Sequence, residues 1–348
     1  MTDAHRGRSR RSQRGAAMLL AMLIVTLVAT LSGAMVWQQW RAVQVEAAER
    51  ARTQSAWILV GALDWARLIL REDKSTVDHL GEPWAVPLAE ARLSSFLAAD
   101  NTNADDGPEA FLSGIISDAQ GRYNLTNLVS GGEVVPAELN TLERLFENIG
   151  VNRSTALTIA EGLRDAGPGV SNPAAATAVP AAAATPASGA SAPTVATPVK
   201  VEVKTRVSNP NPPLRPQSVD QLAWFGIDAD SLQRIAPYVA LLPAVTALNL
   251  NTASPEAMAA VIDGLDLAGA QRLVRAREQK PFNNLSDVEN VLGKQSKPDD
   301  RRVGVTSSFF EVRGRLRLGN RVLEERSLVQ RVQRQVTVLT RERVSLQS

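Results

Sequence analysis

Cysteine and histidine, two residue types common in nucleophilic and zinc chemistry, are almost absent from this sequence. The chain has no cysteine and only two histidines, His5 and His79. Disulfides, histidine-containing catalytic triads and histidine-rich zinc sites therefore lack almost all of the residues that they need. Asp100, Asp105 and Asp106 could suggest calcium, but they lack the regular spacing and the final bidentate glutamate of an EF-hand loop. We therefore expect no enzyme, no cofactor and no metal site, and interpret this acidic run as a solvated turn.

The one junction whose residues suggest a reaction is Arg14-Gly15-Ala16, where a basic leader meets an uncharged apolar run, Ala16 to Trp37. About 20 apolar residues in a helix cross a bilayer core. The leader supplies five arginines: Arg6, Arg8, Arg10, Arg11 and Arg14. Because positive charge flanking a span stays in the cytoplasm, everything after Trp37 is expected outside it.

Three interpretations of this N-terminus are open. The run can be a cleavable secretory signal, since Ser32-Gly33-Ala34 offers small residues at the positions that signal peptidase prefers, although it exceeds a typical apolar signal region. It can be an uncleaved anchor. The Arg14-Gly15-Ala16 junction also resembles the cleavage site of type IV prepilin-like proteins, which prepilin peptidase cuts on the cytoplasmic side before methylating the new terminus.

The segment after the apolar run favours the third interpretation. No proline occurs between Ala16 and Glu82, so one helix can run to about Arg71, roughly 80 Å at 1.5 Å per residue. Apolar residues recur at helical spacings at Val36, Trp40, Val43, Ala47, Ala51, Ile58, Ala62, Trp65 and Ile69. We expect this stripe to hold a globular head, with Trp57 and Trp65 as core residues.

The middle of the chain predicts short helices joined by glycine turns. Two units share one arrangement, with a seven-residue interval from Gly226 to Gln233 and from Gly264 to Gln271. The predicted caps are Ser218 with Gln221, Ser286 with Glu289, Pro255 at a first helical position, and the stops Gly226, Gly264 and Gly293. Before these units, Asp118 to Gly121 is expected to turn a hairpin.

The C-terminal part returns to strands. Apolar residues alternate with charged ones: Phe310, Val312, Leu316 and Leu318 against Glu311, Arg313, Arg315 and Arg317. This period of two predicts a strand with an outer arginine row, followed by strands over 322–331 and 335–340. The expected class is α+β, with a long N-terminal transmembrane helix packed on an antiparallel sheet and a large α-helical insertion of helix-Gly-helix units.

Helix-Gly-helix units also resemble helix-hairpin-helix modules that bind DNA, so a membrane-anchored DNA-binding protein of the competence type is the alternative function. Acidic residues flank the turns Phe225-Gly226-Ile227 and Asp263-Gly264-Leu265-Asp266, where phosphate would approach. No nucleic-acid partner is expected. A third possibility is a generic signal-anchored periplasmic domain.

Taken in order, these parts resemble the minor pseudopilin K family of the type II secretion system, also called general secretion pathway protein K. The motifs are the Arg14-Gly15 junction, the run from Asp118 to Leu128, Leu248-Asn-Leu-Asn-Thr-Ala-Ser-Pro255, and Ser307-Ser-Phe-Phe. The resemblance implies a pilin fold at the tip of the periplasmic pseudopilus, anchored in the inner membrane with its globular part in the periplasm. It also implies minor pseudopilins I and J and prepilin peptidase as partners, and a role in pseudopilus initiation and export of folded proteins.

The resulting division of the chain is a leader at 1–15 that is removed, a transmembrane part at 16–37, the rest of the helix and first strands at 38–134, an inserted helical domain at 135–303, and terminal strands at 304–348. Within the insertion, 167–216 holds ten of the 19 prolines and is expected to be flexible.

The resemblance implies cleavage between Gly15 and Ala16 with methylation of Ala16. Pilin-like subunits usually carry glutamate at the fifth mature position, which is Leu20 here. The family glutamate is thought to neutralise a neighbour's terminal amine within the membrane, so a subunit lacking it suits a position with nothing above it. Family members can bind calcium in the helical domain, but Arg164-Asp165-Ala166-Gly167-Pro168 leaves too few carboxylates, and we expect no such site there.

Overall fold

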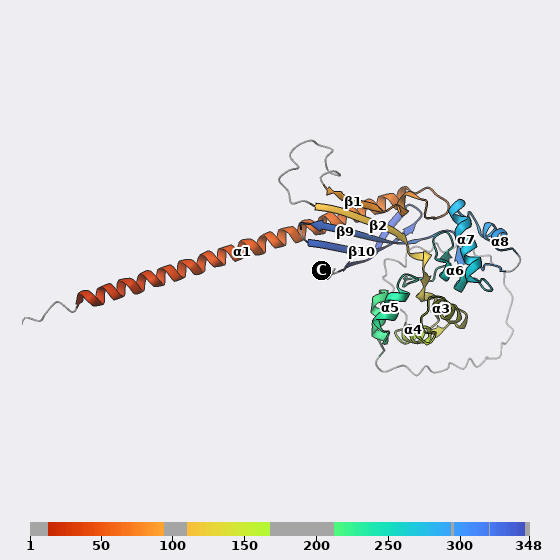
Figure 1. Cartoon of the computed structure of the whole chain (residues 1–348), viewed down its shortest axis with the longest axis horizontal. Helices are drawn as coiled ribbons and strands as arrows, with labels where there is room; N and C mark the ends of the chain where they lie inside the picture. Colours follow the sequence, from red (N-terminus) through yellow and green to blue (C-terminus); the bar gives the residue numbers. More distant parts are fainter. Residues whose placement is uncertain (1–12, 94–109, 168–211, 294–295, 320, 345–348) are drawn as a thin grey trace, which may run out of the picture.

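A single long helix dominates the structure, a computed structural model that describes residues 13–93, 110–167, 212–293, 296–319 and 321–344. This helix, α1 (Gln13–Glu72), has 60 residues without interruption. Figure 1 shows it projecting from a head built of a sheet and short helices. The predicted helix from the apolar run to about Arg71 is confirmed.

The head contains a five-stranded antiparallel sheet in the order β1-β2-β9-β10-β11. Its strands are β1 (Leu88–Arg92), β2 (Ala110–Asp118), β9 (Phe309–Leu318), β10 (Arg321–Val332) and β11 (Gln335–Val344). The end of α1 lies across one face and contacts β9, β10 and β11. The three predicted C-terminal strands are confirmed, and β2 joins them from far earlier in the chain.

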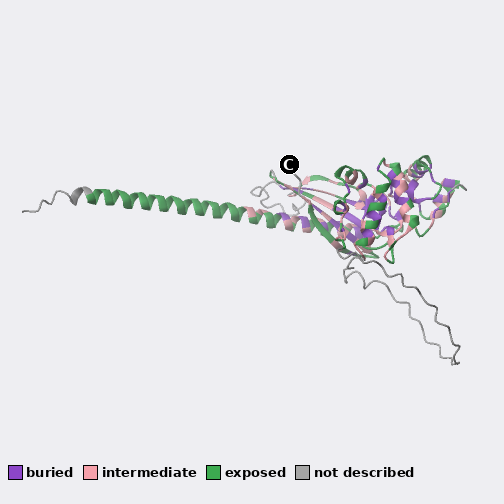
Figure 2. Ribbon diagram, turned by 90° about the horizontal axis from the view of Figure 1, so that it is seen from below, coloured by how far each residue is buried: buried purple, intermediate pink, exposed green. Residues whose placement is uncertain are grey.

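The contact between α1 and the sheet rests on a narrow buried stripe. On α1 it consists of Ser55, Leu59, Leu63, Ala66 and Leu70, all at most 7% exposed. Their spacing of three or four residues places them on one helix face. They meet buried residues of β2, β9, β10 and β11, including Ile116, Phe310, Val312, Leu316, Val329 and Val336. Figure 2 shows burial beginning only where α1 enters the head.

The face of α1 that packs on the head is rotated around the helix axis relative to the predicted face. Trp57 and Trp65 are 70% and 48% exposed, so their interpretation as core residues is wrong. The buried positions lie one or two residues away, at Ser55 and Leu59 on either side of Trp57 and at Leu63 and Ala66 on either side of Trp65. Each residue turns a helix by about 100°, so an error of one position moves a side chain from the core to the surface.

The chain between β2 and β9 forms a second, mainly helical layer at the end of the sheet farthest from the free part of α1 (Figure 1). Its helices are α3 (Pro136–Asn148), α4 (Ser154–Asp165), α5 (Ala229–Ile235), α6 (Pro255–Val261), α7 (Leu267–Gln279) and α8 (Leu285–Leu292), with the 3-10 helices η2 (Ala119–Gly121), η3 (Leu125–Leu128) and η4 (Val219–Phe225). Short strands link them: β3 (Tyr123–Asn124), β4 (Val129–Ser130), β5 (Glu133–Val134), β6 (Val239–Ala240), β7 (Leu248–Asn249) and β8 (Val303–Gly304). This layer has its own core, with Phe146, Ile159 and Met258 at its centre.

The turn chemistry of this layer is largely as predicted. Gly226, Gly264 and Gly293 have positive φ angles of 84°, 74° and 70°, which glycine adopts without the steric cost of a Cβ. Pro255 opens α6, capped by the Ser254 side chain. Two predicted caps are wrong. Asn284 rather than Ser286 caps α8, and Ser218 precedes η4 without a capping bond from its side chain.

The hairpin predicted at Asp118 to Gly121 is also wrong. The Asp118 carboxylate accepts a hydrogen bond from Gln120 N and caps the start of the short 3-10 helix η2. The chain then leaves the sheet, and β3 pairs in parallel with β6 instead of folding back on β2. Leader residues before 13, the acidic run from Asp100 to Asp106, and 168–211 of the proline-rich segment lie outside the described residues.

The stripe makes a direct prediction about stability. Leu70→Ala should lower the free energy of unfolding of the head by about 2 to 5 kcal/mol, because Leu70 is fully buried and truncation leaves a cavity. Leu68→Ala is the matched control. Leu68 is 41% exposed, so its change should stay within about 0.5 kcal/mol. Urea denaturation of the detergent-solubilised chain, followed by tryptophan fluorescence, measures both, and equal losses would contradict this packing.

Candidate functional site

The residues predicted to undergo processing lie at the start of α1. The helix already includes Gly15 and Ala16, and Leu20 is 61% exposed on its surface. By length and apolar composition, the part of α1 beginning at Ala16 qualifies as a membrane span. Cleavage, methylation and the role of Leu20 stay predictions.

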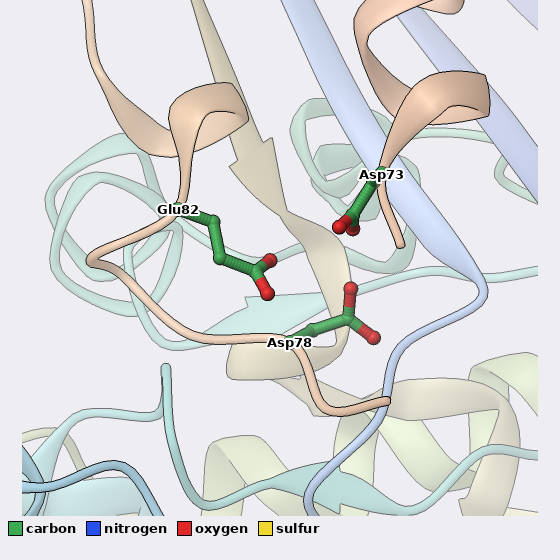
Figure 3. Close-up of side chains that lie close together, drawn as sticks. All are labelled: Asp73, Asp78 and Glu82. Carbon is green, nitrogen blue, oxygen red and sulfur yellow. The ribbon is translucent and has the colours of Figure 1, made fainter. Parts of the chain in front are cut away.

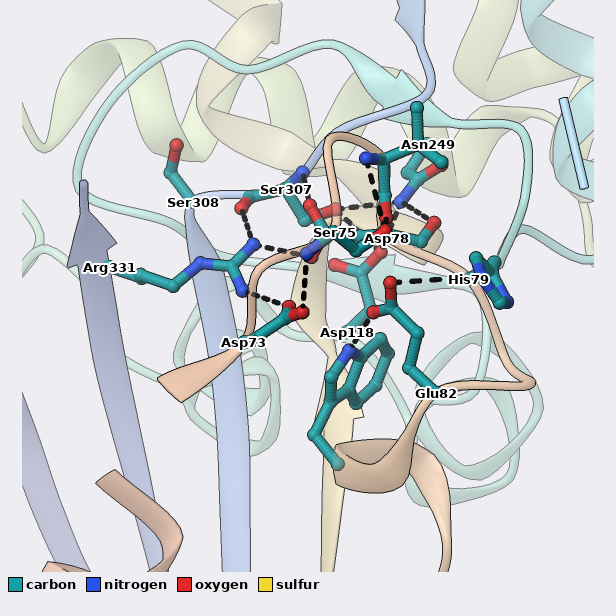
Figure 4. A network of polar contacts seen from close by, with 12 residues as sticks. Asp73, Ser75, Asp78, His79, Glu82, Asp118, Asn249, Ser307, Ser308 and Arg331 are labelled. Atoms are coloured by element: carbon teal, nitrogen blue, oxygen red, sulfur yellow. Dashed lines mark hydrogen bonds and ion pairs between the residues drawn. The ribbon is translucent and has the colours of Figure 1, made fainter. Parts of the chain in front are cut away.

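A network of buried polar side chains forms a junction between the sheet and the helical layer. Asp118, at the end of β2, lies at its centre (Figure 4). Its Oδ2 accepts hydrogen bonds from Asn249 Nδ2 at 2.9 Å, Thr252 Oγ1 at 2.6 Å and Ser307 Oγ at 2.6 Å. One carboxylate therefore joins β2, the β7 region and the segment entering β9.

Arg331 extends this junction to the end of α1. Its Nη1 donates to Asp73 Oδ2 at 2.7 Å and its Nη2 donates to Asp78 Oδ1. The Nη2 group also reaches Ser307 O at 3.2 Å, while Ser307 N donates to Asp78 Oδ2 at 2.7 Å. The guanidinium lies over the ring of Phe310, 4.7 Å from its centroid. Arg331 thus ties β10 to the loop after α1.

Asp73, Asp78 and Glu82 converge in this loop (Figure 3), with ligand oxygens within 4.8 Å of one another. Glu82 Oε2 accepts a hydrogen bond from Trp84 Nε1, and His79 Nε2 lies 3.7 Å from Glu82 Oε1. Such oxygens are the kind that calcium uses, but calcium takes six to eight of them. Here the Arg331 guanidinium already pairs with both aspartates, so the residues fit an arginine-neutralised cluster better than a metal centre.

Burial makes ionisation of this junction costly. Desolvation raises the pKa of Asp78, of Glu82 and of Asp118, although hydrogen bonds partly offset the rise, and for Asp78 the Arg331 charge does so too. A carboxyl whose pKa is higher in the folded chain binds its proton more tightly there. Its contribution to stability is therefore present at low pH and is lost as pH rises through the folded pKa.

A second charged group joins the outer arginine row to the helical layer. Glu311 on β9 is 7% exposed and accepts a hydrogen bond from Arg122 Nη2 at 2.6 Å. Burial opposes its ionisation, but Arg122 and Arg313 lower the pKa of Glu311 to about 2. Part of the predicted solvent face is therefore an internal contact.

The junction was not predicted, although its residues stand in the sequence motifs already described. Asp118, Asn249 and Ser307 each lie at or near the start of one motif, and folding brings all three together. A Cβ on Gly121 would lie 2.8 Å from Thr252 Oγ1, so this glycine permits the close approach of two motifs. The sequence did hold a signal for this junction, because these motifs contain small residues and amide residues that a turn alone does not require.

Near the glycine turns of the helical layer, acidic side chains already bind the backbone N–H groups at the helix starts. Asp228 accepts a hydrogen bond from Ser231 N at 2.8 Å, and Asp266 accepts one from Gly269 N at 2.7 Å. These carboxylates cap the helix starts that a phosphate would approach. Asp165, in the segment where a family calcium site was considered, is bound by Arg164 at 2.9 Å.

The fold and the long apolar helix define a pilin-like subunit, and comparison with known proteins supports this class. The structure resembles one chain in the crystal structure of the GspK-GspI-GspJ complex from the enterotoxigenic Escherichia coli type 2 secretion system, with a TM-score of 0.56 and 19% identity over 86% of this chain and 99% of that chain. The predicted α+β pilin-like class is thereby confirmed.

Sequence comparison identifies the family. Two family models described as type II secretion system protein K match residues 121–244 and 248–306. Proteins named type II secretion system protein K are 26% identical in Pseudomonas aeruginosa, over 90% of this chain and 87% of that protein, and 28% identical in Klebsiella pneumoniae, over 94% and 96%. This chain belongs to the type II secretion system protein K family.

Replacing Arg331 should destabilise the folded chain, because the buried junction depends on its charge. Arg331→Gln should lower the free energy of unfolding at pH 7 by about 3 to 5 kcal/mol, because Asp73 and Asp78 would lose their buried cation. Chemical denaturation of the full chain in detergent measures the loss.

The same variant tests the protonation of the cluster. Because burial raises the pKa of Asp78 and Glu82, lowering the pH from 7 to 5 should shrink the penalty as these carboxyls take up protons. Arg334→Gln, at an exposed turn position, should change stability by less than about 0.5 kcal/mol at either pH. A penalty that is independent of pH would show that Arg331 acts through packing rather than charge.

Proposed function

We propose that this chain is a minor pseudopilin at the tip of a periplasmic pseudopilus, where it supports pseudopilus initiation and export of folded proteins across the outer membrane. The single observation that carries the proposal is α1. One helix contains both an apolar span from Ala16 and, farther along, the stripe that anchors the head. Membership of the protein K family supports the same role.

The tip position is proposed from Leu20. An uncharged residue at this place offers no partner to a neighbouring terminal amine in lipid, and an unpaired buried charge is expensive. A subunit with Leu20 is therefore poorly suited to joining beneath another one. The proposed partners are minor pseudopilins I and J, since a structural neighbour was solved as a GspK-GspI-GspJ complex. The proposed location is the inner membrane, with the head in the periplasm.

The N-terminal processing of the chain tests whether it is a pilin-like subunit. N-terminal sequencing of membrane-extracted protein should find methylated Ala16, as cleavage by prepilin peptidase after Gly15 requires. A start at Met35 would indicate a secretory signal cut after Ala34 and would overturn the proposal. An intact leader would indicate a plain anchor.

A glycine pair in the same helix provides the matched variants. Gly15→Val should leave the leader in place, because the substitution fills the position next to the cleaved bond. Gly33→Val lies within the span, where a Cβ would meet no heavy atom within 4 Å, and should be processed normally. Mass spectrometry distinguishes the precursor from the mature form. Normal maturation of Gly15→Val would count against cleavage at this junction.

A further inference from the structure

Two glycines leave a hollow in the sheet beneath α1. Gly114 on β2 and Gly314 on β9 lie directly opposite each other. Leu88 on β1 pairs with Gly114, and Glu325 on β10 pairs with Gly314, so this row crosses four strands. Alternate residues of a strand share a face, and Gly114 therefore faces α1 together with the buried Leu112. The middle of the row has no side chains to fill the space under the helix.

A cavity of about 240 Å³ occupies this hollow. Its walls are mainly apolar and come from α1, from the 3-10 helix η1 (Pro83–Ala85) and the residues after it, and from the sheet. Ala62 and Ala66 line it from α1, while Trp65 and Val86, which are 48% and 67% exposed, stand at its rim. An engineered apolar cavity of about 150 Å³ in another protein binds benzene. The cavity under α1 has room for a larger aromatic molecule.

Packing against α1 does not account for both glycines. A Cβ on Gly314 would lie 3.4 Å from Leu59 Cδ2, which is close to ordinary van der Waals contact, and Gly314 does not have a positive φ angle. Alanine would therefore fit at this position. At Gly114 the space is tighter, because a Cβ would lie 3.0 Å from Arg313 O. Glycine inside a strand weakens it and often marks a place where a ligand approaches the sheet closely.

The end of the cavity at β10 is polar. Glu325 and Ser327, which are 4% and 2% exposed, line it there. Arg341 Nε donates a hydrogen bond to Glu325 Oε1, so the charge of this carboxylate is already balanced. Glu325 Oε2 lies 3.9 Å from Arg343 Nε, too far for a hydrogen bond, and no described residue donates one to it. Because a buried acceptor without a donor is costly, this end favours a neutral group that donates a hydrogen bond.

The length and position of the cavity favour a free molecule as its occupant. From Leu88 to Glu325 the row crosses three strand spacings, about 14 Å in all. An aromatic side chain of another protein would end well short of Glu325, because its Cα stays outside the rim. Ala62 lies about 37 Å along α1 from Trp37, the last residue of the apolar run. Acyl chains of membrane lipids do not reach that height.

We propose that this cavity is a binding site for an elongated, neutral aromatic molecule that carries an O–H or N–H group at one end. The rings lie between Ala62 and the two glycines, and the donor group binds Glu325 Oε2. The bound molecule contacts both α1 and the sheet, so it stabilises the folded head on its helix. This site is independent of the proposed function, because it uses neither the processing residues nor the buried junction.

Two matched probes test the site in the full-length chain. The first is 4-phenylphenol, an elongated aromatic molecule with one O–H group at its end. The second is 4-methoxybiphenyl, in which a methyl group replaces the donated hydrogen. Each probe is added to the full chain in lipid nanodiscs, and empty nanodiscs give the free probe concentration after partition into lipid. Scanning calorimetry measures the melting temperature, which rises with the concentration of a ligand that binds the folded state.

A pair of phenylalanine substitutions on α1 tests the location. Ala62→Phe places a ring inside the cavity, where the probe would bind, because Ala62 lines it. Ala47→Phe is the matched control, since Ala47 is exposed on α1 before the helix enters the head. The melting temperature of each variant without probe shows whether it folds.

We expect 4-phenylphenol, at about ten times its dissociation constant, to raise the melting temperature of the unaltered chain and of Ala47→Phe by about 3 °C. The shift should be lost in Ala62→Phe, and 4-methoxybiphenyl should need at least a tenfold higher free concentration for the same shift.

Three results would overturn the proposal. They are the absence of any shift in the unaltered chain, an equal shift in Ala62→Phe, and equal effects of the two probes at equal free concentrations. If Ala62→Phe has no cooperative melting transition, the comparison of the two probes on the unaltered chain decides the question.

Discussion

The structure depends on one helix that has to satisfy two environments. Residues near the N-terminus of α1 suit lipid on every side, whereas beyond Ser55 the same helix must bury a stripe and expose the rest. The stripe from Ser55 to Leu70 packs the sheet on the same helix. Because α1 is continuous, the rotation of this stripe also sets which face of the helix stays exposed outside the head.

The buried junction holds the large helical insertion in one orientation on the sheet. Hydrogen bonds are directional, so a carboxylate such as Asp118 with several donors around it admits one arrangement of the segments that supply them. Arg331 adds the end of α1 to the same arrangement. The insertion, sheet and helix are thereby held through one polar centre, and loss of any partner leaves a buried group uncompensated.

Sequence patterns predicted the elements better than their contacts. Periodicity and missing prolines were enough for α1, for the C-terminal strands and for the glycine stops, because these depend on local chemistry. Trp57 and Trp65 were assigned to the core because periodicity gives a face without saying which neighbour covers it. The turn at Asp118 was interpreted as a hairpin because its side chain has partners 130 or more residues away, such as Asn249 and Ser307, and no local pattern reveals them. The processing residues Gly15 and Ala16 could be named only by resemblance.

The central claim is that a subunit of this build stands at the end of a filament. Because the chain has no cysteine, Glu161→Cys at an exposed position of α4 would carry a single gold label on the helical layer. Electron microscopy of labelled pseudopili should show gold at one end of each filament, the end distal to the membrane. Labels distributed along the filament, or confined to its membrane-proximal end, would contradict the account.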